Sequence, residues 1–298
     1  MTILRLLQEN INLTRKLSDY LSLVKYKLSL AVAFSAATGY LICTSILGPD
    51  FIVLIAGIFF LTAGSAALNQ YTEREQDALM PRTMERPVAA KKIPLKSAFV
   101  ALILLLLSGS FLLFLNGLIP LVLGFLGVIL YNLLYTSLKK VTVLAIIPGA
   151  LVGSIPPLIG YTSAGGIVFS NKILFFSAFM FLWQIPHFWL LLIRYGKEYQ
   201  EAGFRTVYDY LNEKQIKNLI LFWILLSVLC LFIFSLVTSL LRKEFAIPGF
   251  ILTLIFIILF CRFLIVVKGS QNLKYAFILL NSYGFGMMLI LIADSIFS

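Results

Sequence analysis

Nine long apolar runs dominate this sequence, and each is long enough to cross the hydrocarbon core of a membrane as a helix. A spanning helix needs about 20 mostly apolar residues and satisfies its backbone hydrogen bonds internally. Of the 298 residues 60% are hydrophobic, more than a soluble domain of this length carries. The predicted spans are residues 21–46, 51–70, 97–115, 118–136, 142–162, 173–194, 216–240, 247–267 and 274–297. The sequence therefore predicts an all-α, polytopic membrane protein with a single domain over residues 1–298.

The polar segment before the first span, residues 1–20, lacks the small-residue cleavage site of a signal peptide. Two forms of this segment fit the sequence. One is a short amphipathic helix in the membrane interface, and the other is a polar terminus without regular structure. In the first form the apolar face consists of Ile3, Leu6, Leu7 and Ile11.

Basic residues are distributed unequally between the two ends of the predicted spans. One end holds 21 of the 24 Lys and Arg residues, and the other holds only Lys172, Arg242 and Lys243. Because Lys and Arg concentrate on the cytoplasmic side, we expect a cytoplasmic N-terminus and an outer C-terminus. Membrane topology thus accounts for the net charge of +11, and no nucleic-acid partner is needed to explain it.

A polar segment between the second and third spans carries four acids and three arginines, although only 12% of the chain is charged. Within it, Asn69, Glu73 and Asp77 are spaced four residues apart and would share one face of a helix. Such a set of oxygen atoms suits Mg²⁺, which binds through one or two carboxylates together with substrate phosphates. An ordinary solvated loop would explain the charges, but it would not explain an asparagine at the end of an apolar helix.

Two arginines, Arg82 and Arg86, follow these oxygen ligands closely. The guanidinium group binds phosphate oxygens through two parallel hydrogen bonds. Oxygen ligands beside arginines at a membrane edge predict a Mg²⁺-diphosphate site for a lipid-like substrate. We therefore expect these two residues and the three oxygen ligands to be catalytic.

The whole polar segment resembles the first signature of the UbiA superfamily of intramembrane prenyltransferases. Its pattern is Asn-x-x-x-Glu-Arg-x-x-Asp-x-x-Met-x-Arg-Thr-x-x-Arg-Pro over residues 69–87. The resemblance implies a bundle of nine helices around a cavity that opens to lipid. It also implies a Mg²⁺-dependent transfer of a prenyl group from an allylic diphosphate.

Other segments resemble, more narrowly, the protohaem IX farnesyltransferase (haem O synthase) branch. They are Trp183-Gln184-Ile-Pro-His187, Tyr131 to Lys140, Pro156 to Tyr161, and Lys25-Tyr26-Lys27. This branch transfers a farnesyl group from farnesyl diphosphate to a vinyl group of protohaem IX, giving haem O. The resemblance also implies the inner membrane of a bacterial-type cell, and an enzyme acting on the product, such as a haem A synthase, as a partner.

From these segments we expect a set of substrate-binding residues: Lys27, Tyr131, Tyr135, Lys139, Lys140, Trp183, Gln184 and His187. The branch has a second acidic signature, which is altered here, and Glu198 stands in it as a further expected metal ligand. The Pro-rich continuation of that signature is missing.

Simpler interpretations stand beside several of these assignments. His187, the only histidine, has three interpretations: a packed helix residue, a residue that positions the acceptor, or a ligand of haem iron. Lys140 is also explained by the basic bias of cytoplasmic helix ends, and the two tyrosines by aromatic residues at the membrane interface. Two other functions stay open, namely a UbiA-type enzyme with a quinone precursor or lipid as acceptor, and a transporter.

Overall fold

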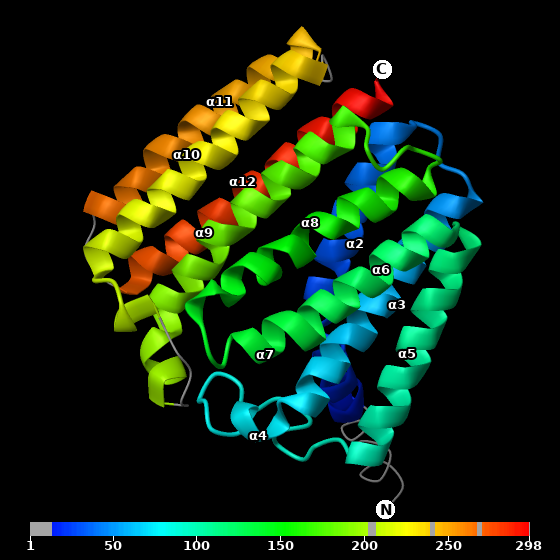
Figure 1. Ribbon diagram of the computed structural model, residues 1–298, viewed down its shortest axis with the longest axis vertical. Coiled ribbons are helices and arrows are strands. Elements are labelled where there is room, and N and C mark those ends of the chain that lie inside the picture. The colour runs from blue at the N-terminus through cyan, green and yellow to red at the C-terminus, as the bar shows by residue number, and fades with distance from the viewer. Residues whose placement is uncertain (1–13, 202–206, 239–241, 267–269, 298) are drawn as a thin grey trace, which may run out of the picture.

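Helices make up the regular structure of the described residues, as the apolar runs predict (Figure 1). The computed structural model describes residues 14–201, 207–238, 242–266 and 270–297. Within these residues nine helical segments are long and apolar enough to span a membrane, so the predicted all-α, polytopic membrane fold is confirmed.

Several spans combine more than one helical segment. The elements are α2 (Tyr26–Cys43), α3 (Pro49–Thr72), α4 (Arg74–Asp77), α5 (Leu95–Leu115), α6 (Leu118–Ile129), η1 (Leu130–Tyr135), α7 (Thr136–Leu138), η2 (Val143–Ala145), α8 (Ile146–Ser163), α9 (Asn171–Glu201), η3 (Val207–Asp209), α10 (Glu213–Thr238), α11 (Lys243–Cys261), η4 (Arg262–Val266) and α12 (Ser270–Ile296). The fourth span runs from α6 through the π-helical turn η1 into α7.

The first span begins later than predicted, at Tyr26, because the backbone changes direction at Lys25. Lys25 has a φ of 43°, in the left-handed region that side chains rarely adopt. Residues 14–23 form a separate helix before this break. The proposed amphipathic face of residues 3–11 lies outside the described residues.

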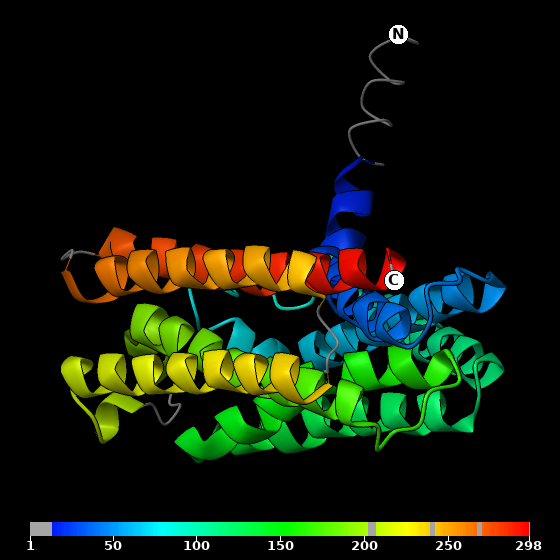
Figure 2. The same cartoon turned by 90° about the horizontal axis from the view of Figure 1, so that it is seen from above.

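Small residues allow α2 and α8 to pack with their backbones in close approach. A Cβ atom added to Gly39 would overlap the carbonyl group of Pro157, and one added to Gly160 would overlap the carbonyl oxygen of Ala36. Glycine is therefore required on both helices, as in other tightly packed membrane helices. Seen from above, α11 and α12 form one layer beside α2, and α10 lies in the opposite layer (Figure 2).

The helix ends that carry the polar segments lie at one end of the bundle. In Figure 1, α4, α7 and the C-terminal end of α9 are all near the bottom, whereas the C-terminal end of α12 is at the top. The two acidic loops, after the second and sixth spans, therefore start from the same end. Which end faces the cytoplasm stays a prediction.

Candidate active site

Asn69, Glu73 and Asp77 lie on one continuous face, as their spacing predicts. The α3 helix ends at Thr72, but the backbone hydrogen bonds continue through the short helix α4. The amide of Glu73 donates to the carbonyl of Asn69 at 2.9 Å, and the amide of Asp77 donates to the carbonyl of Glu73 at 2.8 Å. The Asn69 Nδ2 atom also donates to Glu73 Oε2 at 2.8 Å. All three side chains are buried.

Each buried acid has a basic partner from another segment. Lys139 Nζ lies 2.5 Å from Glu73 Oε2, and Arg86 Nη1 lies 2.7 Å from Asp77 Oδ2. Arg86 donates to both carboxylate oxygens of Asp77. Removing a carboxylate from water is costly unless it is paired and hydrogen-bonded, so these ion pairs allow the acids to stay charged inside the protein.

Lys25 joins this cluster from the break before α2. Its Nζ donates to Asn69 Oδ1 at 3.3 Å and to the hydroxyl oxygen of Tyr131 at 3.4 Å. Burial, together with the positive charge of Arg86, lowers the pKa of Lys25 to about 7. A bound anion would reverse this effect, because it favours the charged ammonium form.

The structure differs here from the prediction for Lys27. Lys27 does not line the cavity described below; its Nζ lies 5.8 Å from the ring centroid of the neighbouring Tyr26, in an outer groove. The left-handed backbone at Lys25 is the physical reason, since it ends one helix and starts the next. Two lysines separated by one residue therefore reach different sides, and the first one enters the site.

Aromatic rings form the wall beside the charged cluster. Tyr131 and Tyr135 share a face as predicted, with ring centroids 5.8 Å apart and an interplanar angle of 12°. Both lie in the π-helical turn η1, a type of distortion that is frequent at functional sites. The ring of Phe188, from α9, lies 5.7 Å from that of Tyr135, and Lys139 Nζ lies 5.5 Å from the same tyrosine ring.

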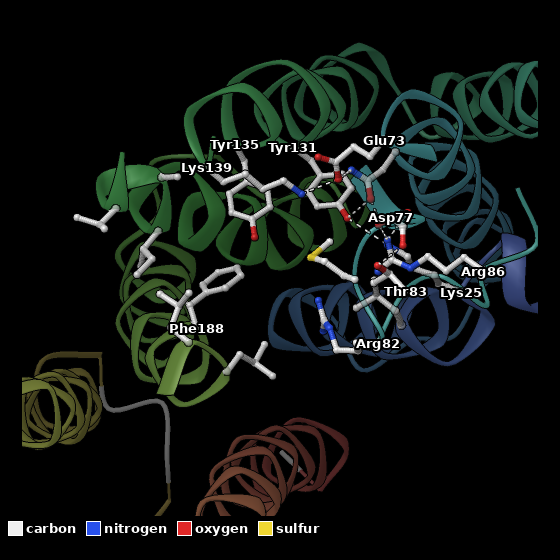
Figure 3. A pocket seen from close by; sticks show the side chains of 18 of the residues that line it. Lys25, Glu73, Asp77, Arg82, Thr83, Arg86, Tyr131, Tyr135, Lys139 and Phe188 are labelled. Carbon is white, nitrogen blue, oxygen red and sulfur yellow. Dashed lines mark hydrogen bonds and ion pairs between the residues drawn. The ribbon is translucent and has the colours of Figure 1, made fainter. Parts of the chain in front are cut away.

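These side chains surround one cavity, with the Asp77–Arg86 pair on one side and Tyr135 and Phe188 on the other (Figure 3). Its lining residues are Lys25, Leu28, Asn69, Glu73, Asp77, Met80, Arg82, Thr83, Arg86, Tyr131, Tyr135, Lys139, Thr142, Val143, Ala145, Ile146, Phe188, Leu191 and Leu192. Four of them are basic and two are acidic, so the lining carries more positive than negative groups. The arrangement suits an anion with an apolar tail.

Arg82 lines the cavity and also connects it to α9. Its guanidinium carbon lies 5.0 Å from the ring centroid of Tyr195, near the end of that helix. Thr83 fixes the loop from within, because its hydroxyl donates to the backbone carbonyl of Asp77 at 2.9 Å. The loop after α4 is thus held against both the acids and the sixth span.

The oxygen atoms of this cluster fit a hard divalent cation. Glu73 Oε1 is buried and has no hydrogen-bond partner among the described residues, which leaves one carboxylate oxygen available to a ligand. No cluster of three or more His, Cys, Asp and Glu residues suited to a metal occurs in the described ranges. An open site of amide and carboxylate oxygens is the form in which Mg²⁺ binds together with substrate phosphates.

Two predicted site residues lie away from this cluster. Lys140 is exposed and does not line the cavity, which agrees with the simpler interpretation of a basic helix end. Glu198 does not line the cavity either, although it lies on α9 at the same end of the bundle. The acids that line the cavity all come from the first signature.

The predicted acceptor-binding residues point to neighbouring helices instead of the cavity. Trp183 Nε1 donates to the carbonyl of Leu280 in α12 at 3.0 Å, and Gln184 packs against Gly153 in α8. His187 Nδ1 lies 3.1 Å from Asn281 Oδ1, also in α12. None of the three lines the cavity, so their roles in binding stay predictions.

Sequence reasoning missed two lining residues that matter for the chemistry, Lys25 and Phe188. Lys25 belongs to the same Lys25-Tyr26-Lys27 segment from which Lys27 was predicted, but the sequence contains no signal for a helix break at Lys25. Phe188 follows His187 directly, and an aromatic residue in an apolar helix gives no local signal of a cavity.

The sequence pattern of the UbiA prenyltransferase family matches residues 30–283. The chain belongs to this family. The match covers most of the chain and includes the two buried acids with their partners Arg86 and Lys139, the tyrosines of η1 and the segment around His187. Lys25 lies before the matched residues. Family membership confirms the resemblance found in the first polar signature.

Relatives within this UbiA family carry a common name, protoheme IX farnesyltransferase. The protein of that name from Oleidesulfovibrio alaskensis is 39% identical over 183 residues, which are 61% of this chain and 65% of the relative. The one from Geobacter sulfurreducens is 36% identical over 183 residues, 61% of this chain and 68% of the relative. The match thus spans about two thirds of the length of these relatives.

Solved structures of UbiA-type proteins share the fold. Digeranylgeranylglyceryl phosphate synthase superposes with a TM-score of 0.75 at 17% identity, covering 95% of this chain and all of that one. A UbiA homolog from Archaeoglobus fulgidus, bound to GPP and Mg²⁺, gives 0.66 at 14% identity, covering 91% of this chain and 99% of that one. The predicted UbiA-type bundle is therefore confirmed.

Proposed function

We propose that this protein transfers the farnesyl group of farnesyl diphosphate to a vinyl group of protohaem IX, giving haem O, in a Mg²⁺-dependent reaction. The observation that carries the proposal is the cavity in which two buried carboxylates and four cations adjoin an aromatic wall. The name shared by the relatives supports farnesyl transfer to protohaem. The Archaeoglobus homolog, bound to GPP and Mg²⁺, supports a prenyl diphosphate with a divalent ion.

Asn69, Glu73 and Asp77 would hold Mg²⁺. When bound, the ion supplies a positive charge that stabilises the departing diphosphate. The Glu73 Oε1 atom, which has no hydrogen-bond partner among the described residues, is the oxygen available to coordinate the ion. Glu198, which does not line the cavity, is not required by this arrangement.

The cations of the site would exchange partners when the substrate enters. In the structure, Lys139 and Arg86 neutralise the acids. With the carboxylates holding Mg²⁺, these two side chains and Lys25 would donate to the diphosphate oxygens, together with Arg82. Preorganised donors in a water-poor site stabilise the charge that grows on the leaving group, and loss of one typically costs about 3–4 kcal/mol.

Bond cleavage leaves the electron pair of the C–O bond on the diphosphate and an allylic cation on the farnesyl chain. Tyr131, Tyr135 and Phe188 would face that cation with their ring surfaces and keep water away from it, which their position in the cavity wall supports. The π electrons of the vinyl group then form the new C–C bond. Water adds to the resulting cation and loses a proton, which gives the hydroxyethylfarnesyl side chain.

The proposed location is the inner membrane of a bacterial-type cell, with the cavity mouth at the cytoplasmic end. The basic bias of the loops at that end supports the orientation. Both substrates are largely apolar and partition into a bilayer, which is where an intramembrane cavity receives them. A haem A synthase acting on the product is the proposed partner.

Incubation of the purified protein with haem B, farnesyl diphosphate and Mg²⁺, followed by mass analysis of the porphyrin, tests the proposal. We expect a porphyrin that has gained the farnesyl group and one hydroxyl group. The same reaction with excess chelator is the control and should give none. A farnesylated quinone precursor or lipid, formed in parallel incubations while haem B stays unchanged, would assign another acceptor. Absence of any prenyl transfer would refute the enzyme and favour the transporter.

A further inference from the structure

A polar pair joins α9 and α12 within two of the candidate membrane spans, outside the cavity lining. His187 Nδ1 lies 3.1 Å from Asn281 Oδ1, and the two residues are 94 positions apart in the chain. His187 lies 9 residues before Gly196, where its span ends, hence about 14 Å deep along a helix. Polar side chains at such depth are costly to place in a membrane and usually have a function.

The orientation of the Asn281 amide is fixed by a second hydrogen bond. Its Nδ2 atom donates to the backbone carbonyl of Phe277 at 2.6 Å, and a carbonyl oxygen can only accept. The oxygen of the amide therefore faces the imidazole. Because that oxygen is also only an acceptor, Nδ1 of His187 must carry the proton. In the neutral ring, Nε2 then has a free lone pair.

Aromatic rings surround the imidazole and connect it to the cavity. The ring of Phe277 lies 4.7 Å from it, that of Trp183 5.8 Å and that of Phe188 5.9 Å. Phe188 also lines the cavity, so the imidazole is one ring away from it. His187 as a residue is intermediate between buried and exposed.

We propose that Asn281 is a positioning residue that holds His187 as the Nδ1–H tautomer and thereby presents Nε2 as a ligand to the iron of protohaem. The proposal rests on the proposed function, because it takes the porphyrin as the acceptor. Hydrogen bonds from the outer nitrogen of a ligating histidine fix the ring and its tautomer in many metal sites. Iron ligation would hold the porphyrin plane in place while the vinyl group meets the farnesyl cation.

The tautomer is directly measurable, because His187 is the only histidine in the chain. Protein labelled with ¹⁵N-histidine gives one pair of imidazole nitrogen signals in NMR. We expect a protonated Nδ1 and an unprotonated Nε2 in the unmodified protein, and a mixture of tautomers in Asn281→Leu. A protonated Nε2 in the unmodified protein would overturn the proposal.

Iron ligation is tested by titrating the protein with haem B and following the Soret band, with metal-free protoporphyrin IX as the comparison. We expect a histidine-ligated spectrum that is lost in His187→Ala. In Asn281→Leu the affinity for haem B should fall about tenfold or more, the usual effect of removing such a partner. Asn281→Asp retains an acceptor oxygen and should restore ligation. Binding of the metal-free porphyrin should be equal in all four proteins.

A merely structural role of the pair predicts a different result. Thr253→Val is the matched control, since it removes another hydrogen bond to α12, the 3.2 Å contact between the hydroxyl groups of Thr253 and Tyr283. If Thr253→Val weakens haem B binding as much as Asn281→Leu does, the pair only joins helices and the proposal fails. Equal haem B affinity of Asn281→Leu and the unmodified protein also refutes it.

Failure of this inference differs from failure of the proposed function. Haem O formation without a histidine-ligated spectrum would refute His187 as an iron ligand and would still support the proposed function. A histidine-ligated spectrum without any prenyl transfer to haem would support His187 as an iron ligand and refute the proposed function.

Discussion

Replacement of Lys139 by methionine separates the ion pair that this lysine makes in the structure from its proposed role in binding the diphosphate. Its ammonium group neutralises Glu73, whose side chain is 3% exposed, at a distance of 2.5 Å. Breaking a buried ion pair by removing one partner costs about 3–5 kcal/mol. Lys139 is itself 19% exposed and Asn69 Nδ2 still donates to the carboxylate, so we expect the lower end, about 3 kcal/mol.

A second substitution in the same chain tests whether the loss of stability comes from the uncompensated charge of Glu73. Glu73→Gln in addition to Lys139→Met removes the uncompensated charge, so the free energy of unfolding should recover most of the loss. Activity should not recover, because the double variant lacks both a proposed metal ligand and a proposed diphosphate donor. Loss of one preorganised donor typically lowers the rate by about 10²–10³. Stability and haem O formation therefore respond in opposite ways to the second change.

Unfolding of the detergent-solubilised protein and haem O formation in the same preparation are the two measurements. Lys140→Met is the matched control: this neighbouring lysine is exposed, so its loss should change stability by no more than about 0.5 kcal/mol. Mg²⁺ should stabilise Lys139→Met more than the unmodified protein, because no ammonium group competes for the carboxylate. Equal free energies of unfolding for the Lys139→Met and Lys140→Met variants would refute a stabilising ion pair between Lys139 and Glu73.

Three further predictions address the metal, the diphosphate and the topology. Asp77→Ala should abolish Mg²⁺-dependent turnover while the protein still inserts, and near-normal activity at limiting Mg²⁺ would contradict the metal assignment. Lys25→Met should weaken farnesyl diphosphate binding about tenfold or more, as expected for a lost hydrogen bond between charged groups, whereas Lys27→Met should leave the dissociation constant unchanged. A reporter fused to the C-terminus should be active only on the outer side of the membrane, and activity in the cytoplasm would invert the proposed orientation.

The sequence alone determined the helical spans and the placement of three oxygen-bearing side chains on one face. Both depend on short-range physics. Inside lipid a helix satisfies its backbone groups within the segment, so an apolar run of sufficient length predicts a span. Asn69, Glu73 and Asp77 share a face because residues four apart are neighbours on a helix, and their backbone hydrogen bonds continue across the end of α3.

The tertiary structure alone decided the partners of these groups. Glu73 meets Lys139 across 66 residues, and His187 meets Asn281 across 94. Neither pairing has a local pattern, because it depends on how whole helices pack against each other. Lys25 and not Lys27 lines the cavity because of one left-handed backbone position. Surrounding packing offsets the strain of that conformation, and no local sequence pattern records this packing.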